Sequence, residues 1–188
     1  MGPTRSLLER LRHEESGFTL IELVTVLGML VIVMTCLSYA MIAAHKAEED
    51  MNRRFASQIN ARIALGQLRR EIHCATAVTP APIGTTSTIT MVLGPRCPTA
   101  PGGITVTWCT VGSGTRHALY RQTGLTCGAS GRKVADYLTS GAIFSYTLQL
   151  PTSLAYVSVS LPVNTNPASG RPDYRLTDDI VLRNSVRV

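Results

Sequence analysis

The chain has 188 residues, of which 45% are hydrophobic and 5% aromatic, and it carries a formal net charge of +6. This apolar content excludes an intrinsically disordered chain, and the length leaves room for one modest domain beside an apolar segment rather than for two domains. The positive charge can favour anionic partners such as nucleic acid or lipid headgroups, but the arginines are scattered, which is more typical of a soluble basic surface.

The N-terminal region combines a short charged stretch with a long apolar one. Residues 1–17 (MGPTRSLLERLRHEESG) end in glycine, and the 22 residues from Leu23 to Ala44 include no charged side chain. A helix of about 20 apolar residues spans the core of a bilayer, whereas a secretory signal has a shorter apolar region before a cleavage site of small residues. The sequence therefore predicts a leader over residues 1–17 and a retained transmembrane helix over residues 18–44, with one carboxylate, Glu22, in the apolar run.

Helical periodicity continues after the apolar segment. No proline occurs between Phe18 and Thr79. The apolar residues that fall roughly on one helical face are Met51, Phe55, Ile59, Leu65, Leu68 and Ile72. We therefore expect one continuous helix of about 60 residues and about 85 Å, whose amphipathic half covers residues 45–78.

Beyond this helix the apolar period changes from about 3.6 residues to about 2. The strand-like runs cover residues 87–93, 103–111, 117–123, 142–150, 154–161 and 179–188. Glycine, proline, serine and asparagine separate them, and VGSGTR is expected to form a hairpin turn between the second and third runs. A sheet that covers the apolar stripe of a long helix predicts an α+β fold, with a β-rich extracytoplasmic domain over residues 79–188.

The cysteines divide into one within the apolar run and four beyond it, which are Cys74, Cys97, Cys109 and Cys127. An even number is typical of an oxidising compartment and allows up to two disulfides, with three possible pairings. If VGSGTR joins two paired strands, Cys97 and Cys127 flank the same end of the hairpin, which favours a Cys97–Cys127 bridge and leaves Cys74 with Cys109. Basic residues on both sides of the apolar run do not settle its direction, but the cysteines favour a C-terminal part outside the cytoplasm.

The stretch GFTLIEL, residues 17–23, closely resembles the processing site of type IV prepilins and type II secretion pseudopilins. By this resemblance a prepilin peptidase cuts between Gly17 and Phe18 and methylates the new amine of Phe18. Glu22, the fifth residue of the processed chain, would then be an assembly residue that pairs with this amine. A charge in the apolar run is tolerable when it is paired. The resemblance implies a pilin-like fold, with the long helix packed on an antiparallel sheet.

A weaker likeness concerns the remainder of the chain. The runs YLTSGAIFSYTLQL, YVSVSLPV and DDIVLRNSV are similar to those of J-type minor pseudopilins and W-type minor pilins, in which an Arg-Asn pair, here Arg183 and Asn184, ends a late strand. Major pilins usually have a proline where this chain has TCLSYAMI, which favours a minor subunit that initiates or caps a filament.

The resemblance also implies partners and a location. The partners would be other pilin or pseudopilin subunits, the prepilin peptidase, an inner-membrane assembly platform and membrane lipid. The protein would be a single-pass inner-membrane protein before assembly and would afterwards lie in a pilus or pseudopilus. An alternative is a DNA-uptake (competence) pilin, whose arginines would contact phosphates. Another is a membrane-tethered enzyme or adhesin in which the motif occurs by chance.

Motifs for catalysis and metal binding are weak. Ser130–Lys133 (SGRK) matches S-x-x-K without its usual companions, and the Thr177–Asp179 stretch could ligate calcium but is more typical of a solvated turn. His73 and Cys74 are adjacent, but no C-x-x-C pair supports a metal site. The sequence therefore predicts a protein that is not an enzyme and that has no cofactor and no metal.

Overall fold

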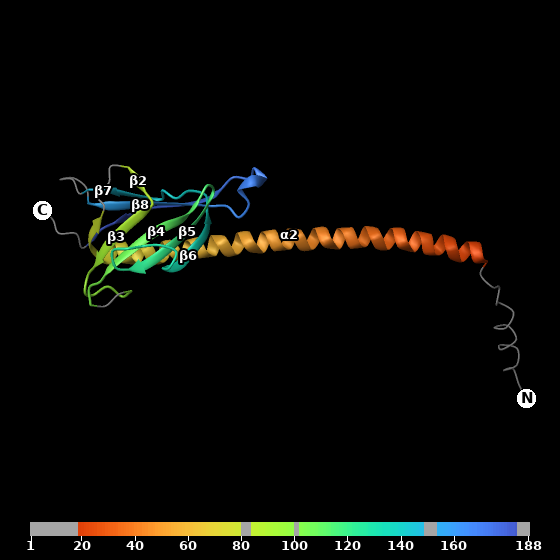
Figure 1. Cartoon of the computed structure of the whole chain (residues 1–188), viewed down its shortest axis with the longest axis horizontal. Helices are drawn as coiled ribbons and strands as arrows, with labels where there is room; N and C mark the ends of the chain where they lie inside the picture. Colours follow the sequence, from red (N-terminus) through yellow and green to blue (C-terminus); the bar gives the residue numbers. More distant parts are fainter. Residues whose placement is uncertain (1–18, 80–83, 100–101, 149–153, 184–188) are drawn as a thin grey trace, which may run out of the picture. The chain divides into compact units, whose positions relative to one another are not determined.

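The computed structural model describes residues 19–79, 84–99, 102–148 and 154–183 (Figure 1). These residues form one α-helix and nine β-strands, and every strand pairing is antiparallel, which makes the fold α+β. The chain divides into two compact units, residues 1–49 and residues 50–188. The whole β-sheet belongs to the second unit.

Helix α2 runs without a break from Leu20 to Cys74, which confirms the prediction of one continuous long helix. It ends four residues before the predicted boundary at residue 78, because Ala75 begins strand β1 (Ala75–Thr79) directly. The sequence of this strand, ATAVT, contains the β-branched residues that favour extended backbone.

The sheet has the order β1-β3-β4-β5-β6-β8-β7-β2, with β9 paired to β8. The remaining elements are β2 (Thr85–Thr86), β3 (Thr88–Leu93), β4 (Thr105–Ser113), β5 (Arg116–Thr123), β6 (Arg132–Leu138), β7 (Phe144–Thr147), β8 (Tyr156–Val163), the 3₁₀-helix η1 (Pro167–Ser169) and β9 (Tyr174–Val181). Each of the six predicted runs contains part of a strand. Strands β1, β2 and β6 were not predicted, and β9 begins before the predicted run at residues 179–188.

The predicted hairpin joins β4 to β5. Ser113 and Arg116 are paired across the ladder, so Gly114 and Thr115 make a two-residue turn. Gly114 has φ 59° at the first of these positions, where a type II′ turn needs glycine. At Gly112 a Cβ would lie 2.2 Å from the carbonyl oxygen of Arg116, so the close approach of the two strands also requires glycine there.

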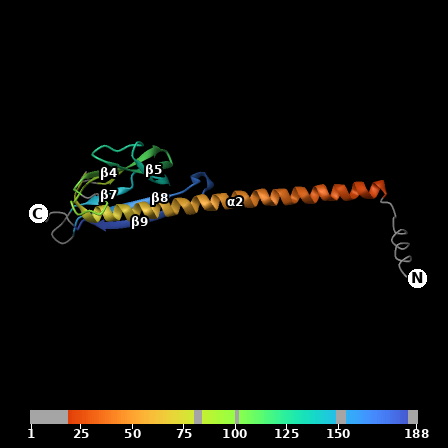
Figure 2. The same ribbon diagram turned by 90° about the horizontal axis from the view of Figure 1, so that it is seen from below.

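The helix packs on the sheet through a face that coincides with the predicted apolar stripe only in its C-terminal part. Figure 2 shows the C-terminal part of α2 between β9 on one side and β4 and β5 on the other. The helical residues buried at this contact are Ser57, Ala61, Ala64, Leu68, Glu71 and Ile72. Steps of four and three residues from Ser57 to Glu71, with Ile72 four residues after Leu68, place them on one face. The small side chains allow the helix to approach the sheet closely.

The predicted stripe therefore differs from the buried one at its N-terminal end. Leu68 and Ile72 are buried as expected, but Met51 and Phe55 are 69% and 64% exposed. The core beneath the helix includes Trp108, Phe144, Val157 and Leu161. Beside Leu68 and Ile72, its helical residues are Ala61 and Ala64, which the six-residue stripe did not include.

Candidate functional site

Glu22, the predicted assembly residue, lies in the first turn of α2. Thr19 precedes the helix, and its carbonyl oxygen accepts hydrogen bonds from the backbone N–H groups of Glu22 (3.0 Å) and Leu23 (3.1 Å). The Thr19 hydroxyl oxygen lies 3.4 Å from the Glu22 backbone nitrogen and accepts from it. Threonine three residues before glutamate at a helix start is the capping-box pattern. Glu22 is thus well placed to support the helix start, a signal present in TLIE that the sequence analysis overlooked.

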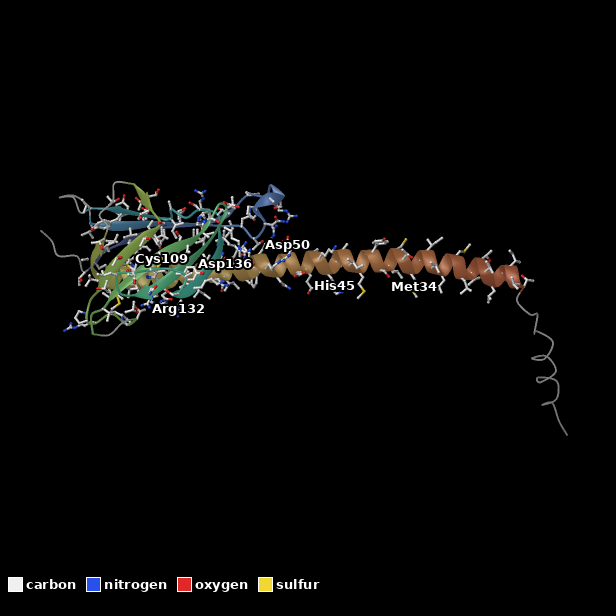
Figure 3. The ribbon with its side chains drawn as sticks, in the orientation of Figure 1. Met34, His45, Asp50, Cys109, Arg132 and Asp136 are labelled. Atoms are coloured by element: carbon white, nitrogen blue, oxygen red, sulfur yellow. A yellow bond between two sulfur atoms is a disulfide. The ribbon has the colours of Figure 1, made fainter. Side chains whose placement is uncertain are left out.

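The segment from Leu23 to Ala44 exposes an uncharged, apolar surface along the whole of its length. It makes α2 long and apolar enough to cross a membrane, and its most apolar stretch is not buried within the structure. Figure 3 labels Met34 within this segment and His45 just beyond it. The length and composition required of a transmembrane helix, as predicted, are therefore present.

Hydroxyl groups in this segment bond to the helix itself. The hydroxyls of Thr25, Thr35 and Ser38 donate to the carbonyl oxygens of Glu22, Val31 and Met34 at 2.9, 2.6 and 2.8 Å. Such bonds to the preceding turn satisfy hydroxyl donors where no water is present. These three polar side chains are consequently compatible with an apolar surrounding.

A second apolar surface on α2 begins at Met51, after the charged stretch at residues 46–50. Met51, Phe55, Ile59 and Ile63 follow one another at intervals of four residues, and their exposed fractions are 69%, 64%, 38% and 59%. We call these four residues the exposed stripe. Residues four apart lie on one helical face, so the stripe is a continuous apolar strip on α2 that faces away from the core of its own domain.

The predicted processing site cannot be placed on the structure, since Gly17 and Phe18 lie outside the described residues. Asn184 also lies outside them, while Arg183 is exposed and follows the end of β9 at Val181. The cleavage, the methylation and the role of the Arg-Asn pair therefore stay predictions.

The structure contains two disulfides, Cys74–Cys97 and Cys109–Cys127, so the predicted pairing of Cys97 with Cys127 and Cys74 with Cys109 is wrong. Pairing of Ala75 with Leu93 in the β1–β3 ladder brings the residues after β3 back to the end of the helix. The Cys74 carbonyl oxygen also accepts from the Gly94 N–H at 3.1 Å.

The second bridge follows from the β4–β5 ladder. Cys109 is paired with Tyr120, and the Cys127 sulfur lies 3.9 Å from the carbonyl oxygen of that same Tyr120. The chain after β5 thus folds back onto the position opposite Cys109. Cys36, the fifth cysteine, is exposed on the apolar part of α2.

The other metal-binding candidates have protein partners. His73 Nδ1 lies 2.9 Å from the Val181 carbonyl oxygen and is hydrogen-bonded to it, and Cys74 is in a disulfide. The Thr177–Asp179 stretch lies within strand β9, where Asp178 pairs with Arg69 at 2.6 Å, so it is not the predicted solvated turn. The described residues include no group of three potential metal ligands.

The SGRK stretch is divided between a turn and a strand, because Ser130 precedes β6 and Lys133 lies within it. The pKa of Lys133 is raised, chiefly by its hydrogen bond to Asp136. Burial alone would raise the pKa of Asp136, but bonds from the Tyr137 backbone N–H and from Lys133 outweigh it and lower this pKa. A lysine that activates a serine must give up its proton, and the shift at Lys133 is in the opposite direction.

A buried polar cluster joins the helix to the sheet. The Glu71 carboxylate is fully buried and accepts hydrogen bonds from Trp108 Nε1 (2.7 Å), Arg121 Nε (2.8 Å) and Gln67 Nε2 (3.3 Å). Arg132 in turn donates to the Gln67 side-chain oxygen. No sequence motif marks this cluster, since its helical residues are 37 to 65 positions from the strand residues that they contact.

Comparison of the chain with protein-family models, curated proteins and solved structures finds no match in any of the three.

Proposed function

We propose that the protein is a minor pilin or pseudopilin, a membrane-inserted subunit that helps to initiate or cap a type IV pilus or type II secretion pseudopilus. The observation that carries the proposal is the surface of α2. Its uncharged segment and the exposed stripe present apolar side chains over most of the helix from Leu20 to Ile63. Large exposed apolar surfaces of this kind mark sites that a membrane or another protein covers.

The two parts of this surface would be covered first by membrane lipid and later by the helices of neighbouring subunits. Lipid covers the uncharged segment while the subunit waits in the inner membrane, with the sheet domain outside the cytoplasm. In the filament the same segment and the exposed stripe pack against the helices of neighbouring subunits. The resemblance of GFTLIEL to prepilin processing sites supports this course of events.

Glu22 has a defined task in this proposal. Processing at Gly17 creates an amine on Phe18, and a neighbouring subunit's Glu22 carboxylate neutralises that amine as the helices come together. An unpaired charge at the centre of a transmembrane helix costs about 2.5 to 3.5 kcal/mol on insertion scales. Pairing the two charges removes that penalty and sets the axial position of one subunit against the next.

The experiment that tests the proposal is mass spectrometry of the protein extracted from membranes of cells that contain a prepilin peptidase. The expected mature chain begins at Phe18 and carries one methyl group on its amine. A Gly17→Leu variant should keep its leader. The bulky leucine replaces the glycine that precedes the cut in the prepilin processing sites that GFTLIEL resembles. A chain that still begins at Met1 in these cells would overturn the proposal.

A further inference from the structure

An open pocket of about 580 Å³ lies where the C-terminal part of α2 meets the end of β5 and the turn before β6. Its walls include Gln67 and Arg70 of the helix, Arg121 and Gln122 of β5, and Ser130 and Arg132 at the start of β6. Figure 3 labels Arg132 on this side of the sheet. The lining residues include three arginines and no carboxylate.

Two of the three guanidinium charges in this pocket have no carboxylate partner within the described part of the chain. Arg121 is neutralised by the buried Glu71, whose Oε1 lies 2.8 Å from the arginine Nε. Arg132 donates only to the neutral amide of Gln67. Arg70 is exposed, and no hydrogen bond or ion pair to it occurs among the described residues. The pocket therefore carries an excess of two positive charges.

The remaining polar groups are also positioned for a ligand. Beside the arginines, the lining includes the hydroxyl-bearing residues Thr99, Thr123 and Ser130. Gly131 also lines the pocket, and a Cβ there would lie 3.0 Å from the Arg121 carbonyl oxygen. The Gly131 N–H donates to the Gly128 carbonyl oxygen at 3.0 Å, which holds this turn against β5.

We propose that this pocket binds a phosphate monoester whose organic part carries a hydroxyl or N–H donor. Two uncompensated guanidinium groups match the charge of a phosphate monoester, about −1.5 to −2 at neutral pH, better than that of a single carboxylate. The volume exceeds that of phosphate alone, and the hydroxyls of Thr99, Thr123 and Ser130 can bond to the organic part. The site is independent of the assembly role proposed for α2, because every residue that forms it lies in the sheet-containing unit.

The test is isothermal titration of the full chain in a non-ionic detergent with glycerol 3-phosphate, and separately with inorganic phosphate and with succinate. We expect saturable binding of one glycerol 3-phosphate per chain, tighter than that of inorganic phosphate and of succinate. Its affinity should fall as the pH is lowered through about 6, where a phosphate monoester takes up a proton.

Arg132→Gln should weaken binding about tenfold or more, since a hydrogen bond to a charged group contributes about 1.5 to 3 kcal/mol. Arg175→Gln is the matched control, because Arg175 is exposed on β9 and does not line the pocket. Arg70→Gln tests the same charge without touching Gln67, in case Arg132→Gln impairs folding. The proposal is overturned by the absence of saturable binding, by equal losses in the pocket and control variants, or by succinate binding as tightly as glycerol 3-phosphate.

Discussion

Glu22 has two roles, one at the start of the helix and one proposed in assembly. The two roles predict different effects of the same substitution. As the residue three positions after Thr19 it supports the helix start, and glutamine can do this as well as glutamate. As a counter-ion for the Phe18 amine only the charged carboxylate serves. The substitution Glu22→Gln therefore removes the proposed assembly role while it leaves the cap and membrane insertion intact.

We expect Glu22→Gln to reduce incorporation into sheared filaments at least several-fold at equal membrane levels, because breaking a buried ion pair can cost about 3 to 5 kcal/mol. Glu48→Gln, which removes an exposed charge beyond the other end of the apolar segment, is the matched control and should assemble normally. Quantitative immunoblotting of filament and membrane fractions gives both values. Equal incorporation of the two variants would mean that the Glu22 charge has no role in assembly and that Glu22 only supports the helix start.

Glu71 of the helix bonds to two residues of the sheet, Trp108 and Arg121. It is fully buried, and Arg121, its ion-pair partner, has a side chain only 15% exposed. Glu71→Gln leaves that guanidinium without a counter-ion, and we expect a loss of about 3 kcal/mol in the free energy of unfolding. Urea denaturation followed by the fluorescence of Trp108, the single tryptophan, measures it.

A second helix-to-sheet ion pair provides the comparison. Arg69 and Asp178 are 2.6 Å apart, but the Arg69 side chain is 54% exposed, so Asp178→Asn should cost no more than about 1 kcal/mol. Equal effects of Glu71→Gln and Asp178→Asn would show that burial does not decide the strength of these pairs. No sequence pattern separates the two: Glu71 and Asp178 each stand beside another charged residue, and only the fold buries one of them.

At the scale of elements, the long helix and the six alternating runs each correspond to an element of the structure, whereas strands β1, β2 and β6 were not predicted. The long helix and the β4–β5 hairpin follow from uninterrupted helical periodicity and from a glycine-containing turn between two alternating runs. Strand β6, RKVADYL, begins with two charges, and its Lys133, Ala135 and Asp136 are residue types that are depleted in strands, so propensity favoured it less than the predicted runs. Its place is set by its neighbours β5 and β8, which the sequence does not reveal.

The missed strand β1 explains the error in the disulfide pairing. Without β1 there was no reason to place the residues after Leu93 beside Cys74, whereas the β1–β3 ladder does this directly. The Cys74–Cys97 bridge spans 23 residues. Replacing both cysteines with serine should lower the free energy of unfolding by about 3 kcal/mol on the chain-entropy estimate, and should loosen the end of α2 from the sheet.

Peptide mapping without reduction checks which cysteines are paired. Urea denaturation of the variant without Cys74 and Cys97 measures the change in the free energy of unfolding. The variant that replaces Cys109 and Cys127 is the matched control, because its bridge spans a similar 18 residues but joins β4 to the chain after β5. Hydrogen exchange at residues 70–74 should rise in the first variant and not in the second. Faster exchange in both would mean that the helix end is not held by its own bridge.

At the scale of the whole molecule, the sheet-containing unit should fold without the apolar segment. The buried core begins at Ala61 and ends at Leu182, and both disulfides lie within this span. None of the core residues comes from residues 19–49, the described part of the first unit. A fragment of residues 46–188, produced under oxidising conditions, should therefore be folded in the absence of detergent, whereas the full chain should need detergent or a membrane.

Trp108 reports on the outcome because it is fully buried between the helix and the sheet. We expect the fragment in buffer and the full chain in detergent to share the same short-wavelength emission maximum, and both to shift to longer wavelength in concentrated urea. The Glu71→Gln fragment should unfold at a lower urea concentration, which links this signal to the helix contact. If the native fragment already emits at the urea-unfolded wavelength, the core depends on residues 1–45, and the division of the chain into a membrane segment and an independently folding domain is wrong.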